Sequence, residues 1–207
     1  MLATARLYFR IMQILLCAVL AICGFSTSLY AQESEQPIKT TLCDIKKDPL
    51  AFNKKLVEVS GYGTFGFEDS MFEDPTCFKG AGRPGIWMEY GGTASTDTMY
   101  CCGVSASNTK KPLIVQDIPV PLIADEQFKR FDTLLHSKNP NKDISVHAVV
   151  RGRIFVMPST TAQLHFWGYG HMGCCMLLAV EQVLSVDSKK AGPSIFDLAK
   201  KYETQKK

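Results

Sequence analysis

The sequence predicts a small, mainly β barrel with one longer helix. Two segments of the 207-residue chain, 53–67 and 143–157, alternate apolar and polar residues and contain glycines, a pattern typical of strands that bend around a barrel. Between them lies one clear amphipathic helix pattern, at residues 125–136. A chain of this length can bury one hydrophobic core, so we expect a single domain over residues 41–187.

The first 31 residues have the pattern of a secretory signal peptide. Arg6 and Arg10 precede an apolar stretch at 11–25, and small residues lead to Ala31. We expect cleavage after Ala31 and export to the periplasm or the medium. The alternative is an uncleaved N-terminal anchor. After cleavage we expect no stable membrane span.

The ends of the expected domain are polar. Residues 32–40 are predicted to be a flexible leader. Residues 188–207 form a basic C-terminal tail, in which 194–202 have the pattern of a short amphipathic helix.

The charge of the chain argues against a nucleic-acid partner. Removing residues 1–31, which contain two arginines and no acidic residue, lowers the formal net charge from +3 to +1. A net charge of +1 does not indicate a basic surface for binding nucleic acid, and an exported chain is separated from most nucleic acid of the cell. The expected partner is an envelope protein or a small ligand, and we expect no cofactor.

Residues 41–52 predict a short helix before the first strand. Thr41 stands three residues before an acidic side chain, as in a capping box, and Leu42 and Ile45 share one helical face. Pro49 limits the helix to one or two turns.

Three strands are then expected, at 55–67, 68–79 and 85–90. In the first strand Val57 and Val59 face one way, and glycines follow at which the strand can bend. The second strand has a local break at Asp74-Pro75.

The next part of the chain is a loop followed by an extended segment. Residues 91–111 are small, polar and aperiodic, and predict a long surface loop. Pro119 and Pro121 exclude a central strand at 113–123, so an extended or edge segment is expected there.

The helix at 125–136 is capped by Asp125 and ends before Asn139-Pro140. Its apolar stripe consists of Ala124, Phe128, Phe131, Leu134 and Leu135.

A fourth strand is expected at 144–156 and a last one at 176–186. The inward positions of the fourth strand are Ile144, Val146, Ala148, Val150, Ile154 and Val156. Its outward positions are His147, Val149, Arg151, Arg153 and Phe155.

The order of three strands, a helix and two strands is that of the OB-fold, a five-stranded, partly open barrel with one helix between strands 3 and 4. The segment DIKKDPLAFNKKLVEVSGYG at 44–63 resembles the entry of exported bacterial OB-like domains. The segment FWGYGHMG at 166–173, with the strand after it, is similar to the closing part of a group of uncharacterised exported bacterial proteins. The resemblance covers residues 41–187. It implies a fold and a compartment but no catalytic residues.

Six cysteines remain after signal cleavage removes Cys17 and Cys23. An even number in an exported chain predicts disulfides, although six cysteines allow fifteen pairings. The candidates are Cys43, Cys77, Cys101, Cys102, Cys174 and Cys175. Adjacent strand residues point to opposite faces, so we expect each sulfur of the two doublets to bond a distant partner. Such bridges would tie the loop at 91–111 to the barrel and add about 3–5 kcal/mol.

The segment 165–175, HFWGYGHMGCC, can be interpreted in two ways. As a metal site for copper or zinc, or as a thiol-redox site, it would use His165, His171, Cys174 and Cys175. As a glycine-rich turn, it would place its aromatic side chains over the mouth of the barrel. We favour the second interpretation because the spacing matches no standard zinc motif.

Two groups of side chains are candidates for ligand binding. His147, Arg151 and Arg153 share the outer face of the fourth strand, which carries ligands in some OB-folds, although such residues can also form a solvated face. The second group consists of Trp167, Tyr169 and His171.

The sequence contains no nucleophile elbow, P-loop, zinc-protease helix or dinucleotide fingerprint. It therefore favours a non-catalytic binding or interaction module of the bacterial envelope. The alternative is a periplasmic metal-binding or thiol-redox protein.

Overall fold

The computed structural model of the protein describes residues 35–66, 69–77, 85–94, 104, 111–137, 145–157 and 168–191. The chain divides into two compact units, Met1–Glu35 and Gln36–Lys207, and all the elements below belong to the second. The expected signal peptide lies outside the described residues.

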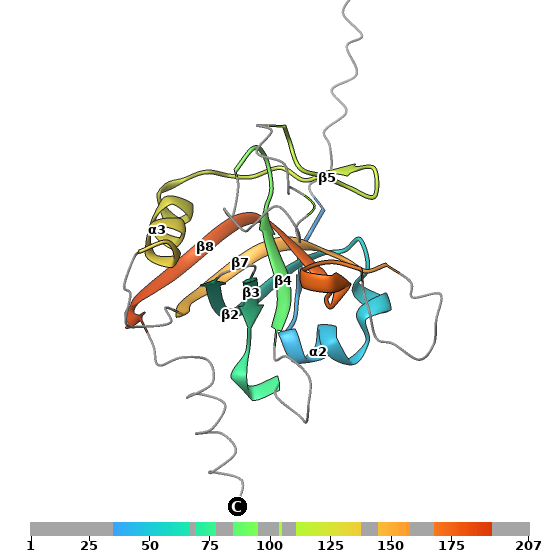
Figure 1. Ribbon diagram of the computed structural model, residues 1–207, viewed down its shortest axis with the longest axis horizontal. Coiled ribbons are helices and arrows are strands. Elements are labelled where there is room, and N and C mark those ends of the chain that lie inside the picture. The colour runs from blue at the N-terminus through green and yellow to red at the C-terminus, as the bar shows by residue number, and fades with distance from the viewer. Residues whose placement is uncertain are drawn as a thin grey trace, which may run out of the picture. The chain divides into compact units, whose positions relative to one another are not determined.

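Strands dominate the described residues, and the helices are few and short (Figure 1). In chain order the elements are β1 (Ile38–Lys39), α2 (Leu42–Lys47), η1 (Pro49–Phe52), β2 (Leu56–Gly66), β3 (Asp69–Glu73), η2 (Pro75–Cys77), β4 (Gly85–Tyr90), β5 (Ile114–Val115), β6 (Ile118–Pro119), α3 (Glu126–Leu135), β7 (Ser145–Phe155), η3 (His171–Gly173) and β8 (Leu177–Ala191). The predicted third strand coincides with β4. Of the second strand predicted at 68–79, only Asp69–Glu73 is a strand, and the chain forms the 3-10 helix η2 from Pro75.

Five strands close into a ring. The main sheet has the order β1-β2-β3-β4-β8-β7, and β2 also pairs with β7. The β4–β8 pair is parallel, whereas the other four pairs of the ring are antiparallel. The fold is therefore mainly β, as the sequence predicts, and its main sheet is mixed.

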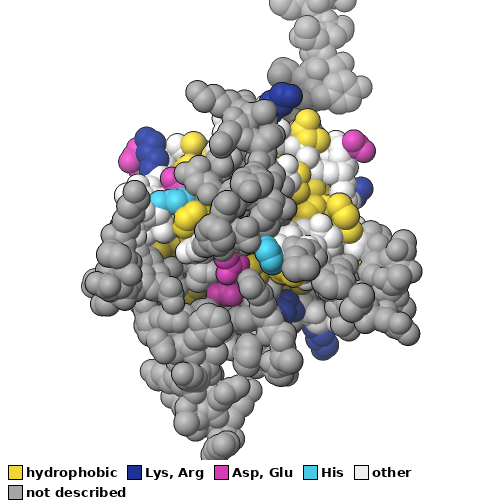
Figure 2. All heavy atoms as spheres, in the orientation of Figure 1, with side chains coloured by type: hydrophobic (Ala, Val, Ile, Leu, Met, Phe, Trp, Pro, Cys, Tyr) yellow, Lys and Arg dark blue, Asp and Glu magenta, His cyan; other side chains and the backbone are white. Residues whose placement is uncertain are grey.

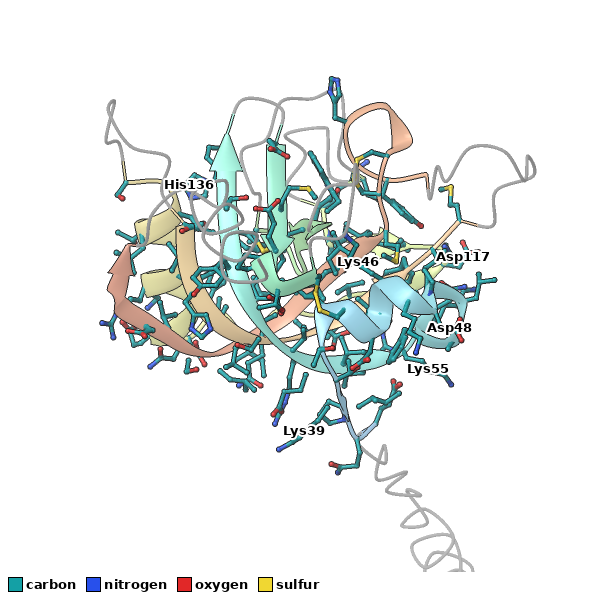
Figure 3. All side chains as sticks on the ribbon, turned by 90° about the horizontal axis from the view of Figure 1, so that it is seen from below. Lys39, Lys46, Asp48, Lys55, Asp117 and His136 are labelled. Atoms are coloured by element: carbon teal, nitrogen blue, oxygen red, sulfur yellow. A yellow bond between two sulfur atoms is a disulfide. The ribbon has the colours of Figure 1, made fainter. Side chains whose placement is uncertain are left out.

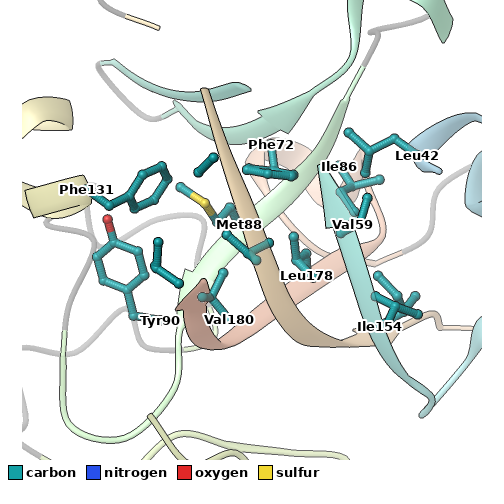
Figure 4. Packing of buried hydrophobic residues seen from close by; sticks show 14 of the residues in the cluster. Leu42, Val59, Phe72, Ile86, Met88, Tyr90, Phe131, Ile154, Leu178 and Val180 are labelled. Atoms are coloured by element: carbon teal, nitrogen blue, oxygen red, sulfur yellow. The ribbon is translucent and has the colours of Figure 1, made fainter. Parts of the chain in front are cut away.

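The inside of the ring is filled by apolar side chains from every ring strand (Figure 4). On β7 the predicted alternation is confirmed for Val146, Ala148, Val150 and Ile154, which are buried inside, whereas Ile144 lies outside the described residues. Val150 is fully buried and lies opposite Val59 of β2. This register fixes which side chains of β2 and β7 face outward.

Helix α3 packs against the ring through its predicted stripe. Asp125 caps it by accepting a hydrogen bond from the Phe128 backbone N–H at 3.0 Å. Phe131 is fully buried, and a Cβ added to Gly63 of β2 would lie 2.5 Å from its ring. A side chain at position 63 would therefore displace the helix. Ala124, which the sequence places on the stripe, precedes the helix and is exposed.

Helix α2 begins as the sequence predicts. Thr41 Oγ1 accepts a hydrogen bond from the Asp44 N–H at 3.1 Å, and Leu42 and Ile45 are fully buried. A disulfide between Cys43 and Cys77 joins the helix to η2, across 34 positions of sequence. The predicted candidates Cys43 and Cys77 thus bond to each other.

Part of the outer surface of the ring is also buried. A second apolar cluster contains Trp87 of β4, Phe155 of β7 and Leu177 of β8, together with Leu113 and Val115 around the β5–β6 hairpin. The sequence predicts that Phe155 faces outward, and it does leave the ring interior, but it is fully buried in this cluster. A side chain that points outward from this sheet is therefore not always exposed to solvent.

The structure differs from the sequence prediction at both ends of the domain. Ile38 and Lys39, placed in the flexible leader, form β1 and pair in parallel with β2. Strand β8 continues to Ala191, beyond the expected end of the domain at residue 187. Residues 192–207 lie outside the described part of the chain.

Candidate functional site

The outer face of β3 and β4 is apolar and acidic. Because side chains alternate along a strand, Met71 and Glu73 of β3 share the outward side with Trp87 and Glu89 of β4. Trp87 and Glu89 are both fully buried. Neither β3 nor β4 contains a lysine or arginine. We call Met71, Glu73, Trp87 and Glu89 the β3–β4 face.

The two glutamates of this face have polar partners. Glu89 Oε1 accepts hydrogen bonds from the Trp87 indole at 3.1 Å and from the Val104 N–H at 2.6 Å, which offsets the cost of burying a carboxylate. Glu73 Oε2 accepts a longer bond, 3.5 Å, from Thr64 Oγ1. Burial lowers the pKa of Lys46 on α2 (Figure 3), and the negative charge of Glu73 opposes that shift.

A glycine-rich turn at 168–175 packs directly on the β3–β4 face. Gly168, Gly170 and Gly173 all have positive φ angles, which residues with a Cβ rarely adopt. A Cβ added to Gly170 would lie 2.6 Å from the Trp87 ring, so the backbone itself rests on the indole. The turn is closed by bonds from the Gly168 N–H to the Gly173 carbonyl at 3.0 Å and from the Gly173 N–H to the Gly170 carbonyl at 3.0 Å.

Tyr169 connects this turn to the β5–β6 hairpin. Its ring is buried in the cluster that contains Trp87, and its hydroxyl accepts a hydrogen bond from Gln116 Nε2 at 2.9 Å. Gln116 and Asp117 form the hairpin turn and both have positive φ. Burial raises the pKa of the Tyr169 hydroxyl. The turn, the hairpin and the β3–β4 face are therefore packed into one assembly.

The doublet Cys174–Cys175 forms a disulfide between sequence neighbours. The expectation that each of these sulfurs bonds a distant partner is therefore wrong. It assumed a regular strand, but Cys174 follows η3 with φ −61° and ψ −26°, a helical conformation, so the two side chains do not point to opposite faces. Cys101 and Cys102, with the expected bridge to the loop at 91–111, lie outside the described residues.

His147, Arg151 and Arg153 lie side by side along the outer surface of β7, and each contacts a neighbouring strand. Arg151 donates from Nε and Nη2 to Glu58 Oε2, both at 3.0 Å, which lowers the pKa of Glu58. Arg153 Nε lies 3.3 Å from Glu181 Oε1.

His147 has two partners on β2. Its Nε2 lies 3.0 Å from Ser60 Oγ, and its ring contacts Tyr62 edge-on. With the two arginines it forms a β2–β7 ladder, in which Arg151 also contacts Gln182 of β8 and Arg153 also donates to the Lys54 carbonyl just before β2. This arrangement is typical of a structural ladder between strands.

The two predicted ligand-binding groups have separate surroundings. His147, Arg151 and Arg153 contact β2 and β8, whereas Tyr169 contacts Gln116 and the cluster around Trp87. His171 is half-buried on η3, in the same turn as Tyr169. Trp167 and His165 lie outside the described residues.

Figure 2 shows that acidic, basic and histidine side chains are scattered over the visible described surface of one face.

Among the described residues, the group with metal-ligand spacing is not the one that the sequence suggested. It consists of Cys43, Asp74 and Cys77, whose ligand atoms all lie within 4.8 Å of one another. The two sulfurs are bonded to each other, so they cannot act as thiolate ligands while that disulfide is intact. His171, Cys174 and Cys175 do not form such a group.

Sequence reasoning missed Trp87, Glu73 and Glu89. The signal was present in GIWMEY at 85–90, where Trp87 and Glu89 alternate with inward apolar residues. A glutamate in an otherwise apolar strand indicates a polar group that needs a partner when buried. Its partner, the Val104 N–H, lies 15 positions further along the chain, and composition does not predict this contact.

No helix in the described part of the chain is long and apolar enough to cross a membrane. The comparisons with protein-family models, curated proteins and solved structures found no match to this chain.

Proposed function

We propose that the chain is an exported, OB-like binding or interaction module of the bacterial envelope, and that it catalyses no reaction. The observation that carries the proposal is the strand order of the ring. Numbered along the chain, its five strands follow one another as 1-2-3-5-4 and back to 1, with strands 3 and 5 parallel. This order supports the OB-like assignment, as does the position of α3 between the third and fourth ring strands in the chain.

The OB-fold analogy assigns the ligand face to the β3–β4 face. OB-folds bind ligands on the face of their second and third strands and with the loops after strands 1 and 4. Here these strands are β3 and β4, and the loop after the fourth ring strand contains the turn at 168–175. The contact between Gly170 and Trp87 places this loop on that face. The assignment of a ligand face is by analogy, since a fold alone does not give a function.

The charge of the β3–β4 face indicates the chemistry of its partner. Glu73 and Glu89 point to this side and neither strand contributes a basic side chain, although Lys46 of α2 opposes part of the negative charge at Glu73. A polyanion such as nucleic acid would be repelled, whereas a cationic or neutral polar segment fits. The partner is therefore expected to be a basic peptide segment of an envelope protein or a small polar ligand.

Export is supported by the cysteine chemistry. The bond between Cys43 and Cys77 is of the kind that forms and persists in oxidising compartments. Together with the signal-peptide pattern of residues 1–31, it favours the periplasm or the medium.

The charge preference can be tested with two matched peptides, oligolysine and oligoglutamate, added to isotope-labelled protein. We expect oligolysine to shift the NMR signals of residues 85–90 and 168–175, and oligoglutamate to leave them unchanged. If oligoglutamate shifts the signals of Arg151 and Arg153, the ligand face is the β2–β7 ladder instead. No shift with oligolysine would contradict the acidic character that we assign to the site.

A thiol-redox role is the second candidate function. The observation that favours it is the disulfide between the neighbours Cys174 and Cys175, which lies in the turn over the proposed ligand face. The metal-binding form of this alternative would use His165, His171, Cys174 and Cys175, and it would require that disulfide to be reduced.

A further inference from the structure

The two disulfides differ in what they can contribute to stability. The Cys43–Cys77 bridge spans 34 positions and restricts a long loop of the unfolded chain, an effect of about 4 kcal/mol. The Cys174–Cys175 bridge joins adjacent residues and restricts almost nothing beyond their own peptide unit. Loop closure therefore does not account for the second bridge.

Cys174 is the more exposed residue of the Cys174–Cys175 bridge. It is half-buried and packs against the cluster with Trp87 and Tyr169, whereas Cys175 is 6% exposed within that cluster. A thiolate can attack a disulfide only at a sulfur that it can reach, so Cys174 is the site of attack and Cys175 is the leaving group.

The conformation of the turn depends on these two residues. Cys175 and Tyr169 exchange both backbone hydrogen bonds, at 2.8 and 3.0 Å, and the Cys174 N–H donates to the His171 carbonyl at 3.2 Å. When the sulfurs are bonded, the two side chains are confined to one relative orientation. Once the bond is broken, each can adopt its own rotamer, and three glycines with positive φ offer little resistance to rearrangement.

We propose that Cys174–Cys175 is a thiol–disulfide exchange site for an exported dithiol reductant, and that its reduction loosens the turn over the β3–β4 face. A thiolate of the reductant attacks Cys174 Sγ, the bond between the two protein sulfurs breaks, and Cys175 leaves as a thiolate that takes up a proton. The second thiolate of the reductant then attacks its own sulfur in the mixed disulfide and releases Cys174, which is protonated. The protein gains two electrons and two protons, and the reductant becomes a disulfide.

The exchange reaction does not depend on the proposed ligand face. Only the consequence, that reduction exposes the β3–β4 face to a partner, rests on the proposed function. The experiment below uses no ligand, so its failure can be distinguished from a failure of the binding proposal.

The test follows Trp87 as the single tryptophan in a Trp167→Phe variant of the exported protein. We expect limiting dithiothreitol to make Cys174 and Cys175 available for alkylation before Cys43 and Cys77. We also expect the same treatment to increase the quenching of Trp87 emission by acrylamide, because the turn that covers the indole loosens. Amide hydrogen exchange of residues 168–175 in the wild-type chain gives the same comparison without a substitution.

Two control variants make the result specific. A Cys174→Ser/Cys175→Ser chain should show the higher quenching before dithiothreitol is added and no response to it. A Cys101→Ser/Cys102→Ser chain should keep the full response. The proposal is overturned if Cys174 and Cys175 are alkylated last. It is also overturned if their reduction leaves both acrylamide quenching and amide exchange unchanged.

Discussion

Replacing Val150 with aspartate is expected to unfold the ring. Val150 is fully buried among apolar side chains, directly opposite Val59, and the cluster around it contains no basic residue in the described part of the chain. A carboxylate there would be buried without a partner, at a cost of more than about 4 kcal/mol, which is a large fraction of the stability of a domain of this size. Circular dichroism and urea denaturation of the exported protein measure the loss.

The matched control is the next residue, Arg151→Ala. Arg151 points outward, and its side chain is 39% exposed, so the loss of its contacts with Glu58 should cost only about 1 kcal/mol. If the aspartate variant folds normally and the alanine variant does not, the strand is shifted by one residue and every outward position on β7 has been assigned to the wrong face.

Removing the Cys43–Cys77 bridge should have the second largest effect. A double substitution to serine releases a loop of 34 positions in the unfolded chain, and we expect the free energy of unfolding to fall by about 4 kcal/mol. The substitution also frees α2, whose Leu42 and Ile45 are fully buried in the core. Urea denaturation under oxidising conditions measures the difference.

The matched control for that experiment is the Cys174→Ser/Cys175→Ser chain. Because this bridge joins neighbours, its loss should change the free energy of unfolding far less than the loss of the first bridge. If both variants lose the same free energy of unfolding, the second bridge stabilises the fold as the first does. The reason for proposing it as an exchange site would then be removed.

Local sequence patterns were sufficient to predict β4, β7 and α3. Strand β4 was predicted at its observed bounds, and the alternation of β7 assigned Val146, Ala148 and Val150 to the interior. Helix α3 was predicted from its cap and apolar stripe. In α3 and over most of β7 one face meets the core, so the period of apolar residues reports the structure directly, whereas β4 is buried on both faces.

The features that were missed depend on contacts between distant parts of the chain. Phe155 is buried on the outside of the ring because the β5–β6 hairpin and the turn at 168–175 cover it, and no local pattern reports a second apolar layer. Likewise β1 exists through its pairing with β2, since two residues carry no periodicity of their own.

The candidate site was predictable only in its parts. The glycines and aromatics at 166–173 indicated a turn over the mouth of the barrel, but the described part of the turn packs on the outer β3–β4 face, where Tyr169 is buried. What the turn covers, Trp87, follows from the register of β4 with β3 and β8, which the sequence does not contain. The bond between Cys174 and Cys175 was missed because a strand geometry was assumed for a turn.

The proposal that the β3–β4 face and its turn bind an envelope partner is tested most directly by site-specific photo-crosslinking in the cell. A photoreactive amino acid is placed at His171 in the turn, at Arg151 on the β2–β7 ladder, or at Lys129, whose side chain is 63% exposed on α3. We predict a discrete crosslinked species in the envelope fraction from position 171, and none from positions 151 and 129. Crosslinks from position 151 or 129 without one from position 171 would contradict the assignment of this face as the binding surface.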